Sequence, residues 1–215
     1  MTLSATAVVT TDFQSAISSD AELPDEAQLQ RASTYAFMAA VLRDAPDQTM
    51  LDQIKSLSQQ TDAAGDELML SMHLLGMAST LLDVALVDDE YHDLFIGLGK
   101  GEVVPYGSWY LTGFLMEKPL SDLRDDLQRL GYERNSSIVE PEDHVAALCE
   151  VMSMMIADGF NLAQQKQFFQ THMASWMGRF FDDLSNAKSA VFYKAFGRFG
   201  AAFVAFEDEY FSMEV

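Results

Sequence analysis

Positive charge is scarce in this chain. Its 215 residues include 13 Lys and Arg against 33 Asp and Glu, a formal net charge of -20. Nucleic acid is excluded as a partner because phosphate binding needs a basic face. Anionic membrane surfaces are disfavoured for the same reason, whereas a basic peptide or protein would be attracted. The competing interpretation is that the acidity only keeps a Met- and Phe-rich protein in solution.

Cysteine is almost absent. The single cysteine, Cys149, excludes a disulfide within the chain. It falls on the apolar stripe of a predicted helix. We therefore expect a buried thiol that acts as a small hydrophobe rather than as a nucleophile.

A long uninterrupted apolar run is also missing. The most apolar stretch, residues 74–87, contains Asp83 and is too short to span a bilayer. No Lys or Arg precedes Arg31, so the N-terminus does not resemble a secretory signal or a transit peptide. These features predict a cytoplasmic protein without stable membrane insertion.

Catalytic and metal-binding signatures are lacking as well. There is no nucleophile elbow, no Walker loop and no telling Cys-His pair. The glycine-rich run at residues 97–101 follows no predicted strand and is interpreted as a turn. Asp89 and His92 have the spacing of half a di-iron site, but His144 has Pro141 three positions before it. We therefore predict no enzyme activity, no cofactor and no metal. A helical-bundle metalloprotein or enzyme with a carboxylate/His site is the alternative.

Helical periodicity fills most of the chain. Apolar residues recur at helical spacing from Asp25 onward, and alternating strand patterns are absent. The prediction is an all-α fold, a single helical bundle domain over residues 25–215, preceded by a mobile N-terminal tail at 1–24. The expected helices lie around residues 29–41, 51–57, 68–85, 91–98, 109–114, 119–130, 141–156, 169–184 and 192–206.

The segment Glu-Pro-Glu-Asp-His at residues 140–144 is the most informative motif. Pro141 suits the first turn of a helix because its φ is preset, and the acids behind it would be favoured by the helix dipole. Residues 145–156 then follow helical spacing. The pattern predicts an exposed polar rim that includes Asp143 and His144. A structural role for His144, with its ring bonded to the backbone, is the competing interpretation.

Three segments in order, together with a later one, resemble the TorD/DmsD family of cytoplasmic chaperones, which mature molybdenum-containing redox enzymes. The matching residues are Tyr91, Leu94, Phe95, Gly97, Pro105, Tyr106, Ser108, Tyr110, Glu140, Pro141, Asp143 and His144, followed by His172, Trp176 and Phe180. The resemblance covers roughly residues 30–205. The chain departs from the family pattern at Glu142, where many members carry Asp, and at residues 149–151.

The resemblance implies a system-specific chaperone of the TorD-like type. Its partner would be a molybdoenzyme catalytic subunit, bound through its twin-arginine signal peptide, through its apo core, or through both, so that cofactor insertion precedes export. An apolar groove with an acidic mouth would suit a peptide with a basic start and an apolar run. A homodimer formed by exchange of C-terminal helices is also possible. The implied client-binding residues are Tyr91, Leu94, Phe95, Pro105, Tyr106, Ser108, Tyr110, Glu140, Pro141, Asp143 and His144.

Overall fold

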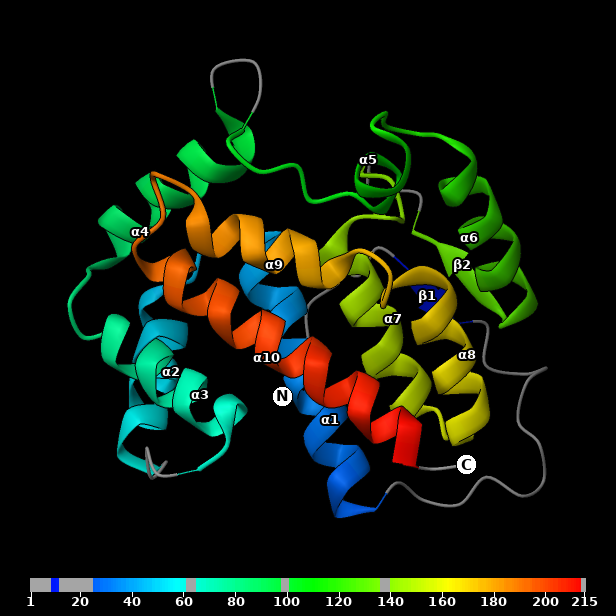
Figure 1. Ribbon diagram of the computed structural model, residues 1–215, viewed down its shortest axis with the longest axis horizontal. Coiled ribbons are helices and arrows are strands. Elements are labelled where there is room, and N and C mark those ends of the chain that lie inside the picture. The colour runs from blue at the N-terminus through cyan, green and yellow to red at the C-terminus, as the bar shows by residue number, and fades with distance from the viewer. Residues whose placement is uncertain (1–8, 12–24, 61–64, 98–100, 136–139, 214–215) are drawn as a thin grey trace. The chain divides into compact units, whose positions relative to one another are not determined.

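The computed structural model describes residues 9–11, 25–60, 65–97, 101–135 and 140–213, and these are mostly helical (Figure 1). The predicted all-α fold is confirmed. The helices are α1 (Glu26–Arg43), α2 (Gln48–Gln60), α3 (Glu67–Ala78), α4 (Val84–Tyr91), the π-helix η1 (His92–Ile96), α5 (Gly107–Thr112), α6 (Lys118–Arg129), α7 (Val145–Ala157), α8 (Leu162–His172), α9 (Met177–Asn186) and α10 (Phe192–Met213). None of these helices is both long enough and apolar enough to cross a bilayer.

A short antiparallel strand pair accompanies the helices. Strand β1 (Val9–Thr11) pairs with β2 (Tyr132–Arg134), with Thr10 opposite Glu133. Neither strand shows an alternating apolar/polar pattern, since each has only three residues. The predicted tail at 1–24 otherwise lies outside the described residues.

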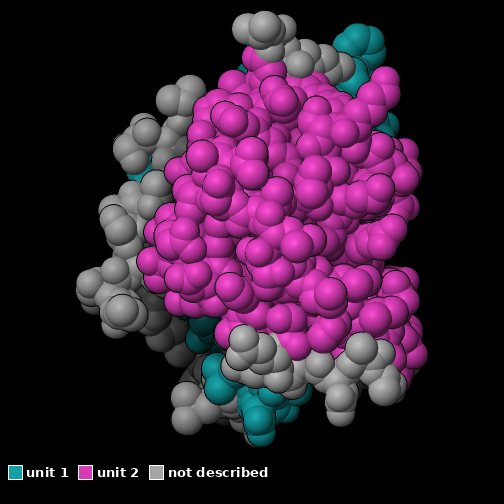
Figure 2. Space-filling model, turned by 90° about the vertical axis from the view of Figure 1, so that its left-hand side faces the viewer, with its two compact units in different colours: residues 1–42, 106–175 teal, residues 43–105, 176–215 magenta. Residues whose placement is uncertain are grey.

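The chain divides into two compact units, coloured separately in Figure 2. Unit 1 comprises residues 1–42 and 106–175, and unit 2 comprises residues 43–105 and 176–215. Each unit is therefore built from two separate stretches of the sequence. That residues 25–215 form a single domain stays a prediction.

In unit 1, polar contacts join α1 to α7 and α8. The Ser153 hydroxyl donates to the Ala32 carbonyl oxygen at 2.9 Å. Arg31 is buried and donates to Oε1 of Gln165 at 2.8 Å. Because these partners lie more than 100 positions apart, they fix the N-terminal helix against the later ones.

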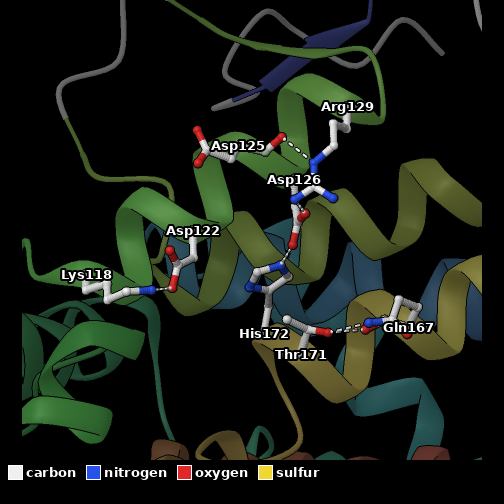
Figure 3. Close-up of polar contacts among 8 residues, drawn as sticks. All are labelled: Lys118, Asp122, Asp125, Asp126, Arg129, Gln167, Thr171 and His172. Carbon is white, nitrogen blue, oxygen red and sulfur yellow. Dashed lines mark hydrogen bonds and ion pairs between the residues drawn. The ribbon is translucent and has the colours of Figure 1, made fainter.

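A buried histidine joins α8 to α6 in the same unit (Figure 3). Nε2 of His172 lies 2.7 Å from Oδ2 of Asp126, and Arg129 forms an ion pair with the same carboxylate. Burial lowers the pKa of His172, and the neighbouring Asp126 carboxylate opposes that shift without cancelling it. The folded chain thus favours the neutral ring, with Nε2–H donating to Asp126.

In unit 2, α10 packs against α9, α3 and α4 (Figure 1). Glu90 is buried and holds the start of α10, because its carboxylate accepts from the backbone N–H groups of Val191, Phe192 and Tyr193 at 2.7–2.9 Å. Helices α2 and α3 approach closely at Gly76. A Cβ there would lie 2.5 Å from the Ser58 nitrogen, so this contact requires glycine.

Two predicted helices are interrupted in the structure. The helix expected over 68–85 ends at Ala78, and α4 begins after Asp83, whose side chain accepts from the Leu86 N–H at 3.0 Å. The helix expected over 169–184 is broken between α8 and α9, where the N–H groups of Met173 and Ala174 both bond to the Phe169 carbonyl. Apolar periodicity continued across both breaks, so the sequence pattern did not reveal them.

The His172–Asp126 contact predicts a pH-dependent stability. Since the folded-state pKa of His172 lies below its ordinary value of 6.5, the unfolded chain binds the proton more readily. Stability should therefore fall as the pH drops below about 6.5, and His172→Gln should remove that part of the loss. At neutral pH the substitution should cost about 1–3 kcal/mol through the altered buried hydrogen bond.

Urea unfolding of the native chain and the variant, each at about pH 7.5 and about pH 5.5, measures this effect. The native protein should lose more stability on acidification than the variant does. Equal losses in the two proteins would show that the ring is not held neutral.

Candidate functional site

The start of α7 differs from the sequence prediction. The helix begins at Val145 rather than at Pro141, and His144 is its N-cap, with Nδ1 accepting from the Ala146 N–H at 3.1 Å. Residues 141–144 form a turn in which the His144 N–H bonds to the Pro141 carbonyl at 3.2 Å. The predicted first turn was wrong because the imidazole caps the helix itself.

The predicted exposure of the rim was also wrong. Glu142, Asp143 and His144 are only 4%, 3% and 6% exposed. Glu142 forms ion pairs with Arg124 at 2.8 Å and with Arg134 at 3.5 Å. Burying a charge is costly unless it is paired. Arg124 and Arg134, which come earlier in the sequence but lie close in space, make the burial of Glu142 possible.

Asp143 ties the start of α5 to the start of α7. Its Oδ2 accepts from the Ser108 N–H at 2.8 Å, and its backbone oxygen accepts from the Gly107 N–H at 2.9 Å. Within the part of the chain that the structure describes, its buried Oδ1 has no hydrogen-bond partner. One carboxylate oxygen thus accepts a hydrogen bond that joins two helices, and the other oxygen is left without a partner among the described residues.

Tyr106 and His144 form the neighbouring contact. Their backbones make an antiparallel bridge, and their rings meet edge to face at 5.0 Å between centroids. Burial raises the pKa of Tyr106 to about 12, with smaller contributions from the Glu140 and Asp143 carboxylates. The phenol therefore stays protonated near neutral pH and can act as a hydrogen-bond donor.

The predicted site residues fall in both units. Tyr91, Leu94, Phe95 and Pro105 belong to unit 2, and the other seven belong to unit 1. In unit 2, Leu94 is fully buried, and the Tyr91 hydroxyl donates to the Arg43 carbonyl at 2.8 Å. The residues that are buried are Tyr91, Leu94, Pro105, Ser108, Asp143 and His144; those that are partly exposed are Phe95, Tyr106, Tyr110 and Pro141; and Glu140 is exposed.

An exposed apolar loop in unit 1 escaped the sequence analysis. Helix α5 ends at Gly113, which has a φ of 84°, and the following Phe114 and Met116 are 69% and 72% exposed. Leu111 and Leu115 are exposed as well. We call residues 111–116 the apolar loop. Its sequence signal is a short apolar run between a helix-ending glycine and Pro119, which lies in the first turn of α6.

Specific hydrogen bonds fix this loop. The Thr112 hydroxyl is bonded to the Ser108 carbonyl at 2.8 Å, and it receives the Phe114 N–H at 3.2 Å. The Met116 N–H donates to the Ser108 hydroxyl at 3.2 Å. Met116 has a φ of 60°, which is unfavourable for a residue with a side chain. Backbone strain of this kind persists only where surrounding contacts impose it, and it clusters at functional sites.

A pocket of about 360 Å³ lies beside the loop, and Met116 forms part of its wall. The first turn of α6 and two arginines complete the lining. Both apolar and cationic groups therefore face the same space. The lining residues are Met116, Glu117, Lys118, Leu120, Ser121, Arg124, Arg134 and Pro141.

Two observations concern the metal and thiol chemistry considered from the sequence. Among the described residues, no three His, Cys, Asp or Glu side chains are grouped so that they could hold a metal ion. Cys149 is buried as predicted, and burial raises the pKa of its thiol.

The hydrogen bonds of Asp143 predict a structural role that can be measured. Asp143→Ala should lower the free energy of unfolding by about 1–3 kcal/mol, because the buried Ser108 N–H loses its acceptor. The matched control is Glu140→Ala, an exposed acid three positions away, which should stay within about 0.5 kcal/mol. Chemical denaturation of both variants is the measurement. If Asp143→Ala were as stable as Glu140→Ala, the junction would not depend on this carboxylate.

The chain has relatives among known proteins. The nitrate reductase delta subunit family model matches residues 55–182. "Chaperone protein TorD" of Aliivibrio salmonicida is 24% identical over 207 residues, covering 86% of this chain and 96% of that one. "Probable Tat proofreading chaperone DmsD" of Haemophilus influenzae is 25% identical over 174 residues, covering 78% and 85%.

A solved structure has the same fold. It is the crystal structure of "A Putative Redox Enzyme Maturation Protein" from Archaeoglobus fulgidus, with a TM-score of 0.54, 16% identity, and coverage of 87% of this chain and 99% of that one. At this identity the likeness concerns the fold alone. The family match, however, spans more than half of the chain. The resemblance inferred from the motifs is confirmed, and the chain belongs to the nitrate reductase delta subunit family, together with the TorD and DmsD chaperones.

Proposed function

We propose that this protein is a cytoplasmic chaperone for a molybdenum-containing redox enzyme, and that it binds the catalytic subunit before that subunit is exported. Family membership and the chaperone names of its relatives support this proposal. The observation that carries it is the apolar loop, which buried motif residues hold at the surface of unit 1.

The apolar loop has the properties of a client-binding surface. Its four large apolar side chains are all exposed and lie within six residues of one another, and exposed apolar groups commonly mark interaction sites. Ser108 and Thr112 hold its backbone in place, so little order has to be gained on binding. We assign Ser108, Asp143 and His144 to positioning the loop rather than to contacting the client.

The pocket beside the loop suits an extended polypeptide. Leu120 and Pro141 offer apolar contacts, and the guanidinium of Arg124 can donate to backbone carbonyl groups. Tyr106, Tyr110, Glu140 and Pro141 retain exposed surface in the same unit and would contact the client there. The segment bound would be the twin-arginine leader or an apolar part of the apo core.

The apolar side chains should supply most of the affinity. Burying one Phe or Met side chain fully is worth about 1.5–3 kcal/mol, whereas an exposed ion pair contributes about 0.2–1 kcal/mol. Removing loop side chains should therefore weaken client binding more than removing single charges does.

A pair of loop substitutions tests the proposal. Phe114→Ser combined with Met116→Gly deletes two exposed apolar side chains, and glycine also relieves the strained φ at position 116. Stability should stay within about 1 kcal/mol, while capture of the client from lysate should fall by about tenfold or more. The retained proteins are identified by mass spectrometry.

The matched control is Leu29→Ser, which alters a 53% exposed leucine on α1 of the same unit. The native chain and this control should both retain a molybdoenzyme subunit. The proposal is wrong if the native chain retains no redox-enzyme subunit. The assignment of the loop is wrong if the double variant captures the client as well as the native chain does.

A further inference from the structure

A very short ladder holds strand β1 in unit 1. Its three residues, Val9–Thr11, pair antiparallel with Tyr132–Arg134 of β2, and both strands belong to the same unit. Among the described residues, these two strands make up the whole sheet. Two-stranded ladders are marginally stable at best, and each backbone hydrogen bond adds little net stability. The pairing of β1 with β2 should therefore form and break easily.

Strand β2, in contrast, is fixed by contacts that do not involve β1. The Tyr132 side chain is buried, its hydroxyl donates to Oδ2 of Asp158 at 3.0 Å, and its ring lies 6.0 Å from the ring of Phe160. At the other end of the strand, Arg134 forms an ion pair with the buried Glu142 at 3.5 Å. We therefore expect β2 to keep its place when β1 leaves, with the edge that β1 covers then open.

A covalent connection keeps β1 close to this edge. Residues 12–25 join β1 to α1, and α1 is fixed to α7 and α8 by the contacts of Ala32 and Arg31. A connection of this length gives the attached strand an effective concentration on the order of 1 mM at its partner. A three-residue ladder that would hardly form between dilute separate molecules can therefore form within the chain.

The edge of β2 lies beside the pocket that the proposed function assigns to an extended polypeptide. Arg134 belongs to both, because it ends β2 and lines the pocket together with Met116 and Pro141. Strand β2 also contacts α6, whose first turn forms another part of the pocket wall (Figure 1). An extended chain in this pocket thus has a strand edge within reach at one side and the apolar loop at another.

We propose that the edge of β2 takes up an extended segment of the client as an added strand, and that β1 occupies this edge in the client-free chain. That the segment belongs to a client rests on the proposed function. Recognition uses the backbone N–H and C=O groups of the segment, as in other cases of strand addition. Strand β1 is then an internal competitor, and the need to release it lowers the apparent affinity for the client.

An uncovered edge would be a liability for a client-free chaperone. Unpaired N–H and C=O groups along a strand are a template for pairing with other chains, and β1 covers them. A client segment replaces β1 because it gains contacts with the apolar loop in addition to the ladder. Burial of large apolar side chains outweighs a few backbone hydrogen bonds. The device thus favours segments that satisfy both surfaces over strands that offer backbone groups alone.

Proline substitutions in β1 test the competition. Val9→Pro with Thr10→Pro alters two adjacent positions, and alternate residues of an antiparallel pair donate across the ladder, so one proline removes a cross-strand donor. The matched control, Val9→Ile with Thr10→Val, keeps both N–H groups and has β-branched side chains that favour strands. Hydrogen exchange at residues 132–134 should be about tenfold faster in the proline variant and unchanged in the control. Equal exchange in the native chain and the proline variant would overturn the inference.

A synthetic peptide with the sequence of residues 5–15 supplies the strand from outside. Its dissociation constant should be on the order of 0.1 mM, since an effective concentration of about 1 mM then favours the paired state about tenfold. At about 1 mM, the peptide should restore the protection of residues 132–134 in the proline variant, and a peptide with proline at positions 9 and 10 should not. If neither peptide restores protection, the edge of β2 does not accept a strand and the inference fails.

Client binding separates this inference from the proposed function. The purified molybdoenzyme subunit identified by the capture experiment should bind the proline variant about tenfold more tightly than it binds the native chain or the control. Equal affinity would show that β1 does not compete, and weaker affinity would make β1 part of the binding surface; both overturn the inference and leave the chaperone function standing. If the native chain captures no redox enzyme, the proposed function fails, and the peptide experiment still decides whether β1 covers an edge that accepts a strand.

A second pair of prolines repeats the test at a shifted position. Thr10→Pro with Thr11→Pro should have the same effects on hydrogen exchange and client affinity, because it too removes a cross-strand donor. Melting curves of all variants establish that they are folded. Opposite effects of the two proline pairs on client affinity would contradict a competition through the ladder.

Discussion

The side chain of Asp143 is the contact on which the candidate site depends. Its Oδ2 and its backbone oxygen accept from Ser108 and Gly107, and so join the starts of α5 and α7. Ser108 in turn receives the Met116 N–H on its hydroxyl. One buried carboxylate therefore supports a strained, exposed apolar loop through a single intervening residue. A buried motif residue can thus hold an exposed segment in place without being exposed itself.

The excess of acids is used in two physically different ways. Some carboxylates are part of the fold: Asp66 and Asp83 cap helices, Glu90 gathers three N–H groups at α10, and Glu142 neutralises two arginines. Each of these carboxylates has a hydrogen-bond or ion-pair partner within the fold. The acids left exposed on α4 and η1 have few cations near them in sequence, so they shape the field that an approaching segment meets.

Apolar periodicity by itself determined the all-α fold and the burial of Cys149, since both depend on spacing along one helix. The motif at 140–144 pointed to the family, and it lies where the starts of α5 and α7 meet. Tertiary structure decided exposure: Glu142 and Asp143 are buried because Arg124 and Ser108, 18 and 35 positions earlier, provide their partners. It also decided that Phe114 and Met116 face outward, although apolar residues are expected inside. The free-energy cost of burying a polar side chain depends on its partners, and partners that are distant in the sequence cannot be identified from a local pattern.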